Sequence, residues 1–394
     1  MKNKINVYSE IEPLESVLLH RPGKEIENLT PDLLERLLFD DIPFLKVAQE
    51  EHDKFAEVLI NNKVQVFYIE KLVQEALDQN PNLKDKFVDQ FIDEAKIEKE
   101  WKNKYREFLM SMSNLDMVNE MIGGTKKIDL DPKDKSDYPF ISDPLPNLLF
   151  QRDPFASVGN GVFLNKMWSV TRNRETIFAD FVFKNHKDFK EQIEIYYDRN
   201  NEFPIEGGDV LVLNKEILII GISQRTSIDA VRLLSDKLFK NTTFKKIIAM
   251  DLPKSRSYMH LDTVFTNIDY DKFIVHPLIF DDINNFKIIE ISQEGEKEIK
   301  ESLVKFLEDI TGKKIQLIKC GGEDSIAAGR EQWNDGTNVL AIAPGVVIAY
   351  ERNWATIDLL EKAKVKVLKI PSSELSRGRG GPRCMSMPIV RKQK

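Results

Sequence analysis

The sequence predicts an α/β fold of five αβ units around a pseudo-fivefold axis, a five-bladed α/β-propeller, with an all-helical domain inserted after the first unit. The main observation is a repeat. Beyond residue 147, similar segments begin with an acidic residue at intervals of 56, 53 and 62 residues, at Asp153, Asp209, Asp262 and Asp324. Each segment has two strand-like runs, a helix-like run and a closing strand. Units this short cannot close a core alone, so we expect them to share one.

Residues 1–70 form the first predicted unit. The apolar run Val17–Leu19 predicts a strand, and the spacing of apolar residues from Phe44 to Ile60 predicts a helix. The alternation from Val64 to Ile69 predicts a second strand. The first unit therefore has the same components as the later ones.

Residues 71–137 form the predicted helical insertion. Charged residues dominate this stretch, and apolar residues recur at helical spacing without a strand pattern. Gly123 and Gly124 end the helices. The prolines between residues 131 and 146 predict an irregular return to the main body, which occupies residues 138–394.

Within the main body we expect helices at residues 177–183, 228–239, 298–310 and 357–362, and closing strands at 246–250 and 365–370. In three units an arginine follows an apolar strand: Arg172, Arg225 and Arg352. An ordinary doubly wound sheet has the same rhythm and is the alternative. Its usual G-x-G-x-x-G fingerprint does not follow the first strand.

Composition narrows the class of partner. Acidic residues outnumber basic ones by 64 to 57, which gives no electrostatic reason to bind nucleic acid or an anionic membrane. The chain has neither an apolar run long enough for a membrane span nor the apolar segment of a signal peptide. Its two cysteines lack metal or disulfide spacing. We therefore expect a cytoplasmic protein with a small or cationic ligand.

Residues 376–388 predict a nucleophile loop around Cys384. Three cations stand nearby, Arg377, Arg379 and Arg383, and we expect them to lower the pKa of the thiol. Three glycines are expected to take positive φ and let the backbone approach a ligand: Gly378, Gly380 and Gly381. The alternative is a basic disordered tail. Apolar residues follow at once, however, and only residues 391–394 look like a solvated end.

Other candidate residues lie far upstream. Asp153 precedes a proline, and Glu206 and Asp209 flank two glycines, although both patterns also occur in plain turns. His260 and Asp262 stand two residues apart, so on a strand they share a face. A histidine paired in this way is the best base among the five in the chain. Metal-binding spacings such as H-E-x-x-H are missing, so we expect no metal.

Carboxylates beside a thiol define a reaction class. Several acids in one pocket suit a planar cation with paired N–H donors, such as a guanidinium, whose carbon the sulfur attacks. His260 and Glu206 suit the proton transfers. Arg172 and Arg225 would hold a carboxylate, so the ligand is expected to be a free amino acid with a cationic tail.

The blocks at residues 147–154, 206–209, 259–263 and 380–388 closely resemble arginine deiminases of the guanidine-modifying superfamily, which has the pentein fold. The resemblance covers nearly the whole chain and includes the helical insertion. It implies that Cys384 is the nucleophile and His260 the general acid and base. It also implies that Asp153, Asp262 and Glu206 bind the guanidinium group.

The same resemblance assigns the rest of the substrate site. Asn147, Arg172 and Arg225 match residues that hold the α-carboxylate or α-amino end, Arg379 matches a mobile arginine that closes over the pocket, and Phe150 matches an apolar wall. The implied reaction converts L-arginine and water to L-citrulline and ammonia in arginine catabolism, without metal or organic cofactor. A homo-oligomer, a dimer or larger, is also implied.

Alternatives remain open at this point. An amidinotransferase, an agmatine deiminase or a methylarginine hydrolase would share the thiol, histidine and acids, although agmatine would leave Arg172 and Arg225 without a carboxylate. An arginine-binding sensor would keep the pocket without turnover, and a cysteine peptidase fits poorly because Cys384 lacks the sequence context of that class. The second cysteine, Cys320, is expected to be a buried strand thiol.

Overall fold

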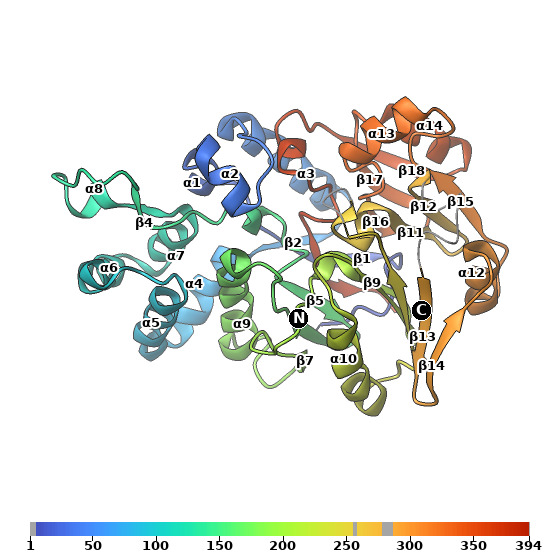
Figure 1. Ribbon diagram of the computed structural model, residues 1–394, viewed down its shortest axis with the longest axis horizontal. Coiled ribbons are helices and arrows are strands. Elements are labelled where there is room, and N and C mark those ends of the chain that lie inside the picture. Colours follow the sequence, from blue (N-terminus) through green and yellow to red (C-terminus); the bar gives the residue numbers. More distant parts are fainter. Residues whose placement is uncertain (1–4, 255–257, 278–286, 394) are drawn as a thin grey trace.

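The structure is a computed structural model that describes residues 5–254, 258–277 and 287–393. It has a mixed α/β fold with several small sheets and a group of helices at one side (Figure 1). Among the described residues, no helix is both long and apolar enough to cross a membrane. The prediction of a mixed α/β fold is confirmed, and the helical insertion as a separate domain stays a prediction.

Within the described ranges, five sheets share one strand pattern, in which the first strand runs antiparallel to the second and the second parallel to the third. Four of them follow the chain: β5 (Phe155–Val158), β6 (Gly161–Leu164) and β7 (Glu194–Tyr197); β8 (Val210–Asn214), β9 (Ile217–Ile222) and β10 (Lys246–Asp251); β11 (Phe265–Asp269), β12 (Lys272–Val275) and β15 (Gln316–Lys319); β16 (Leu340–Ala343), β17 (Val346–Tyr350) and β18 (Lys366–Ile370). The second strand β9 is a fully buried apolar run, which is typical of a strand covered on both faces.

The remaining sheet of this kind joins the two ends of the chain. Its order is β19 (Met387–Arg391), β1 (Leu14–Leu19) and β2 (Gln65–Tyr68), with β19 antiparallel to β1. The C-terminal segment thus supplies the first strand of the N-terminal unit. This pairing fixes the loop before β19, which carries Cys384, against the body of the protein.

A helix connects the second and third strands of each unit. These helices are α3 (Leu45–Asn61), α9 (Thr176–Asn185), α10 (Ile228–Asn241), α12 (Leu303–Thr311) and α14 (Trp354–Lys362), close to the predicted positions. The helix predicted at residues 298–310 begins too early. Its start belongs to the hairpin of β13 (Lys287–Ser292) and β14 (Gly295–Ile299), and the helix begins after Ser302, whose side chain caps it by accepting from the Lys305 N–H.

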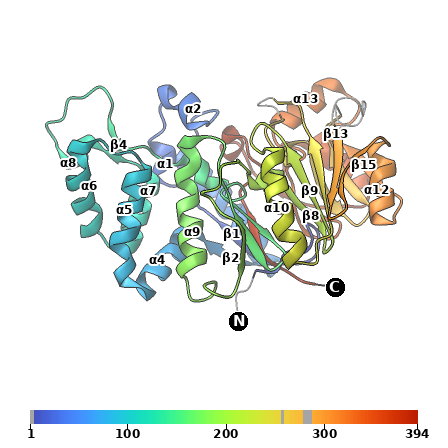
Figure 2. The ribbon, with the colours of Figure 1, turned by 60° about the horizontal axis from the view of Figure 1, so that its bottom comes forward.

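The helical insertion comprises α4 (Ile69–Gln79), α5 (Lys84–Glu94), α6 (Lys99–Ser111) and α7 (Asn114–Gly123). It lies beside α9, on the side away from most of the sheets (Figure 2). Phe87 of α5 packs against Phe181 of α9 with ring centroids 4.5 Å apart. Shared apolar side chains therefore fix the insertion to the second unit.

The return segment is less irregular than its prolines predict. Phe140–Ser142 forms β4, which pairs with β3 (Thr125–Lys126) after the turn at Gly124. Gly124 has φ 79°, a conformation that favours glycine. Three short helices lie near this part of the chain: α1 (Lys24–Glu27), α2 (Pro31–Leu37) and α8 (Lys127–Leu130).

The start of the last repeat was misplaced by the sequence pattern. Asp324 does not precede a strand; it caps the N-terminus of α13 (Ser325–Trp333) by accepting from the Ile326 and Ala327 N–H groups. The first strand of that unit follows Asn338 instead. A polar side chain therefore stands one to three residues before the first strand of every unit: Asp153, Asp209, Asp262, Asn338 and Cys384.

The predicted solvated end is also corrected. Arg391 is 1% exposed and donates from Nη1 to the Glu12 carbonyl at 2.7 Å and from Nη2 to the Ala341 carbonyl at 2.8 Å. Although Arg391 lies near the C-terminus, its side chain binds carbonyls of the N-terminal segment and of β16. Only Lys392 and Gln393 are exposed at this end of the described chain.

Candidate active site

His260, Glu206 and Asp153 form one side of the site. The His260 Nε2 lies 2.8 Å from Glu206 Oε2, and its Nδ1 lies 3.7 Å from Asp153 Oδ1. All three side chains are almost completely buried. The structure therefore brings together three predicted catalytic residues, of which Asp153 and His260 are more than 100 positions apart in the sequence.

The two glycines after Glu206 make this approach possible. A Cβ on Gly208 would lie 2.6 Å from the His260 ring, and a Cβ on Gly207 would overlap the Arg152 carbonyl. Asp209 accepts from the Leu261 N–H at 2.8 Å and from the Ser223 hydroxyl at 2.6 Å. Asp209 therefore holds the backbone between His260 and Asp262.

His260 and Glu206 form an ion pair. Burial alone would lower the pKa of His260, but the carboxylates of Asp153, Glu206 and Asp209 outweigh burial and raise the pKa to about 9. Burial alone would raise the pKa of Glu206, but Arg225, His260 and Arg172 lower it to about 2. At neutral pH the imidazole is therefore protonated and the carboxylate ionised.

Cys384 forms the other side of the site. Its Sγ lies 3.7 Å from Asp262 Oδ2. The whole residue is buried, with 5% of its surface exposed. The backbone is held on both sides, because the Cys384 N–H donates to Asn338 Oδ1 at 2.9 Å and the Cys384 carbonyl accepts from the Arg152 N–H at 3.0 Å. The loop is therefore fixed to two neighbouring units.

The expectation that nearby arginines lower the pKa of Cys384 is wrong for this structure. Burial, Asp262, Asp153 and Asp335 raise the pKa of the thiol well above its ordinary value, and Arg383 opposes them only in part. Arg383 is engaged by carboxylates, and Arg377 pairs with Asp41 at the surface. Without a ligand, Cys384 is therefore a neutral thiol.

The glycines of the loop serve another purpose than expected. Arg379, not a glycine, has positive φ, at 57°. Gly378, Gly380 and Gly381 are required by close packing, because a Cβ would overlap the rings of Phe39 and Phe150 or the Asn338 carbonyl. The glycines therefore allow the loop to pack closely against Phe150, and they do not provide positive φ angles.

The predicted substrate-binding residues lie around the same site. Arg172 donates from Nη1 to Asp153 Oδ2 at 3.0 Å and from Nη2 to Glu175 Oε2 at 2.8 Å. Arg225 lies 3.9 Å from Glu206 and 5.0 Å from the centre of the Trp168 ring. In this structure Arg172 is held by acids, whereas Arg225 contacts Glu206 without a hydrogen bond.

The other three are also buried. The Asn147 side chain donates to the Leu37 carbonyl at 2.6 Å. Phe150 stacks with Phe39, with centroids 6.2 Å apart. The Arg379 guanidinium lies 3.7 Å from the centre of the Trp333 ring. Phe150 thus has the placement of an apolar wall.

Several buried polar atoms of the site have no hydrogen-bond partner among the described residues. Two are acceptors, Asp153 Oδ1 and Asp262 Oδ1. Four are donors, the Nε and Nη1 groups of Arg225 and of Arg379. Buried polar groups are nearly always satisfied, so these atoms indicate a ligand with cationic donors at one end and an anionic acceptor at the other.

Asp153, Glu206 and His260 are also close enough to be considered as metal ligands, since ligand atoms of the three lie within 4.8 Å of one another. An ion there would have to displace the Arg172 guanidinium from Asp153 and the proton from His260. The side chains already balance one another's charges. The set therefore fits an organic cation better than a metal, and the expectation of no metal stays a prediction.

The sequence reading missed several residues of the site. Glu175, three residues after Arg172, binds it, and the Trp168 N–H donates to Glu206 Oε1 at 3.0 Å. Asn338 would have been found if the last repeat had been aligned on its first strand. No sequence pattern marks Asp335 or Glu10 as part of the site, because single acidic residues in loops are common.

Comparison with known proteins decides the family. The sequence model of the arginine deiminase family matches residues 35–391. The chain belongs to this family. Arginine deiminase from Mycoplasma capricolum subsp. capricolum is 62% identical over 99% of this chain and 98% of its own, and arginine deiminase from Clostridium perfringens is 50% identical over 98% of both.

Solved structures share the fold of this family member at low identity. An amidinotransferase from Microseira wollei has a TM-score of 0.58 at 16% identity, covering 99% of this chain and 98% of that one. The N-terminal domain of a cyanobacterial arginine dihydrolase has a TM-score of 0.56 at 13% identity, covering 95% and 97%. Both support the mixed α/β architecture with small sheets.

Proposed function

We propose that this protein is an arginine deiminase, a hydrolase that converts L-arginine and water to L-citrulline and ammonia. Full-length relatives of that name at 50% and 62% identity support the activity. Within the site, the observation that carries the proposal is a pair of carboxylates beside Cys384, each with one oxygen, Asp153 Oδ1 and Asp262 Oδ1, that has no hydrogen-bond partner among the described residues.

The substrate guanidinium is proposed to lie between Asp153 and Asp262. Its paired N–H groups donate to the two free oxygens, since carboxylates bind guanidinium in this forked geometry. Arg225 and Arg379 then hold the α-carboxylate with their free donors, and Asn147 and Arg172 complete that end. The Phe150 ring lines the aliphatic part.

Binding of the cation is proposed to activate the nucleophile. Burial, Asp262, Asp153 and Asp335 raise the pKa of Cys384, and a guanidinium between Asp262 and Asp153 would offset the charges of those two acids. The thiol then releases its proton to water beside its target carbon, because His260 already carries a proton. The enzyme would thus form its thiolate only when arginine is present.

The chemistry follows from these charges. The thiolate attacks the guanidinium carbon, and protonated His260 gives its proton to the departing nitrogen, which leaves as ammonia. An S-alkylthiouronium stays on Cys384. Neutral His260 then takes a proton from water, whose oxygen adds to the same carbon and expels the thiolate. Glu206 stabilises His260 while it is charged.

The test is direct. Purified protein incubated with L-arginine should yield citrulline and ammonia in equal amounts, and Cys384→Ala should yield neither. Cys320→Ser is the matched control, because Cys320 is completely buried and accepts from the Thr356 hydroxyl. Citrulline production that survives Cys384→Ala, or its absence from the wild type, would refute the proposal.

Agmatine is the substrate that best separates this function from its nearest alternative. It carries the guanidinium but no carboxylate, so Arg225 and Arg379 would stay unsatisfied. Leaving buried polar groups unpaired lowers kcat/KM by orders of magnitude. Arginine should therefore be strongly preferred over agmatine in a direct competition assay.

Three broader expectations belong with this function. The five similar sheets are proposed to surround a pseudo-fivefold axis, which a crystal structure would test. The protein is proposed to act in the cytoplasm, and fractionation would test that. A homo-oligomer is also proposed, and light scattering after size-exclusion chromatography would measure its mass.

A further inference from the structure

Arg383, the residue before Cys384, is 1% exposed. Its Nη1 donates to Asp262 Oδ2 at 2.8 Å, and its Nη2 donates to the Val210 carbonyl at 2.8 Å. Its Nε and Nη2 both reach the Glu10 carboxylate at 3.2 Å. Every nitrogen of the guanidinium is therefore committed to a named acceptor.

The Asp262 oxygen that accepts from Arg383 is the oxygen that lies near the sulfur. Oδ2 is 2.8 Å from Arg383 Nη1 and 3.7 Å from Cys384 Sγ. The other oxygen, Oδ1, has no hydrogen-bond partner among the described residues. Arg383 thus fixes which carboxylate oxygen meets the sulfur and which is left for a ligand.

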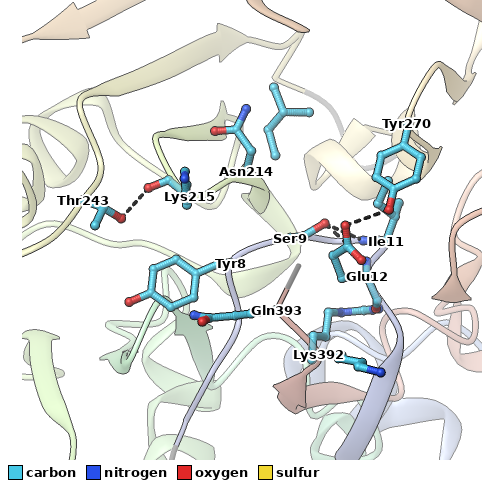
Figure 3. Close-up of a pocket in the computed structure, with 12 residues that line it drawn as sticks. Tyr8, Ser9, Ile11, Glu12, Asn214, Lys215, Thr243, Tyr270, Lys392 and Gln393 are labelled. Atoms are coloured by element: carbon cyan, nitrogen blue, oxygen red, sulfur yellow. Dashed lines mark hydrogen bonds between the residues drawn. The ribbon is translucent and has the colours of Figure 1, made fainter.

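The Glu10 backbone is held in place by β8. Its N–H donates to the Val212 carbonyl at 2.8 Å. Its neighbours Ser9 and Glu12 line a cavity of about 530 Å³, where Glu12 accepts from the Tyr270 hydroxyl at 2.8 Å (Figure 3). Glu10 is 5% exposed and turns to Arg383 instead.

The charges in this region are closely balanced. Burial alone would raise the pKa of Glu10, but Arg383 and Arg152 lower it to about 2, so Glu10 is ionised. Arg152 and Arg391 are the other cations near this pair. On the sulfur side, Asp153 and Asp335 add negative charge to that of Asp262.

We propose that Glu10 and Arg383 are positioning residues for the reaction: through a buried ion pair they hold Asp262 with Oδ2 at the Cys384 sulfur and Oδ1 free for the guanidinium. This inference rests on Cys384 being the nucleophile, as proposed above. Neither residue touches the substrate. Arg383 acts on the thiol mainly by restraining and neutralising Asp262.

The pH dependence of Cys384 alkylation by iodoacetamide, without substrate, tests this proposal. Arg383→Met should raise the pKa of the thiol, because the Asp262 charge is no longer offset. In an Asp262→Asn background the same change should shift the pKa by roughly half as much or less, since the carboxylate is gone. Glu10→Gln should lower the pKa of the Cys384 thiol, because Arg383 would then form an ion pair with Asp262 alone.

Turnover supplies a second readout. Arg383→Met should lower kcat/KM for arginine about 10²-fold, the usual cost of a displaced reactive group, and Arg383→Lys should recover part of that loss. The matched controls are Arg232→Met and Glu296→Gln, an exposed pair joined at 2.7 Å between α10 and β14. These should leave both the thiol pKa and kcat/KM unchanged.

Equal pKa shifts of Arg383→Met in the two backgrounds would overturn the proposal, because Arg383 would then act without Asp262. An unchanged pKa in folded Glu10→Gln would also overturn it. Circular dichroism melting shows which variants fold. If Arg383→Met does not fold, Glu10→Gln and Arg383→Lys test the proposal instead. Alkylation needs no turnover, so this failure differs from a wild type that makes no citrulline.

Discussion

The two sides of the site are buried to a similar degree but carry opposite charge states. On one side, His260 and Glu206 are ionised and bonded to each other at 2.8 Å. On the other, Cys384 is a neutral thiol 3.7 Å from Asp262, whose Oδ1 has no partner among the described residues. The general acid, His260, is therefore already protonated in the free protein, whereas Cys384 is proposed to become a thiolate only when the positively charged substrate binds.

The largest predicted effect comes from changing the acids around Cys384. Asp153→Asn and Asp262→Asn each remove half of the guanidinium site, and each should lower kcat/KM at least about 10³-fold, in line with the loss of a buried charge partner. In the absence of substrate, Asp262→Asn should also lower the pKa of Cys384. Steady-state kinetics and alkylation measure the two effects; a variant with lost activity and an unchanged thiol pKa would contradict the comparison.

Gly208→Ala should disturb the other side. Its Cβ would lie 2.6 Å from the His260 ring, so the ring must move, and kcat should fall roughly 10²-fold. Gly329→Ala in α13 is the control, because its Cβ meets nothing within 4 Å. That control should keep full activity and gain stability of about 0.5–1 kcal/mol. Equal kinetics for the two variants would mean that His260 tolerates displacement.

Glu206→Gln should change how stability depends on pH. The pKa of His260 is raised from its ordinary 6.5 to about 9, so its stabilising contribution is full below 6.5 and is lost as pH rises through 9. Without the Glu206 charge the pKa of folded His260 falls, so its stabilising contribution is smaller and is completely lost at a lower pH. Urea unfolding across this range should show the earlier decline, and parallel curves for the variant and the wild type would argue against an ion pair.

Trp168→Leu should have the smallest effect. Its ring lies 5.0 Å from the Arg225 guanidinium and is 45% exposed, and exposed cation–π contacts contribute about 0.5–1 kcal/mol. The KM for arginine should rise a few-fold with kcat unchanged. A change in kcat alone would place Trp168 with the reacting groups instead.

The sequence pattern predicted the element order well, because strand and helix periodicities are local. It placed β1, α3, β2 and most later helices within a few residues. It failed at residues 298–299, where alternating charges belong to an exposed hairpin, and at Asp324, where an N-cap resembled the start of a repeat.

The site was predictable in its members but not in its charges. Asp153, Glu206, His260, Asp262 and Cys384 do come together, as the repeat and the family resemblance led us to expect. Which arginine meets which acid depends on contacts between units: Glu10 and Arg383 are 373 positions apart. Counting nearby cations therefore gave the wrong direction for the pKa of Cys384.

The central claim is that a guanidinium cation ionises Cys384, and the ultraviolet absorbance of the thiolate measures this directly. At neutral pH the free enzyme should show no thiolate absorbance from Cys384. Saturating methylguanidinium should produce it in the wild type and not in Cys384→Ala. A thiolate already present in the free enzyme, or none after the cation binds, would contradict the account.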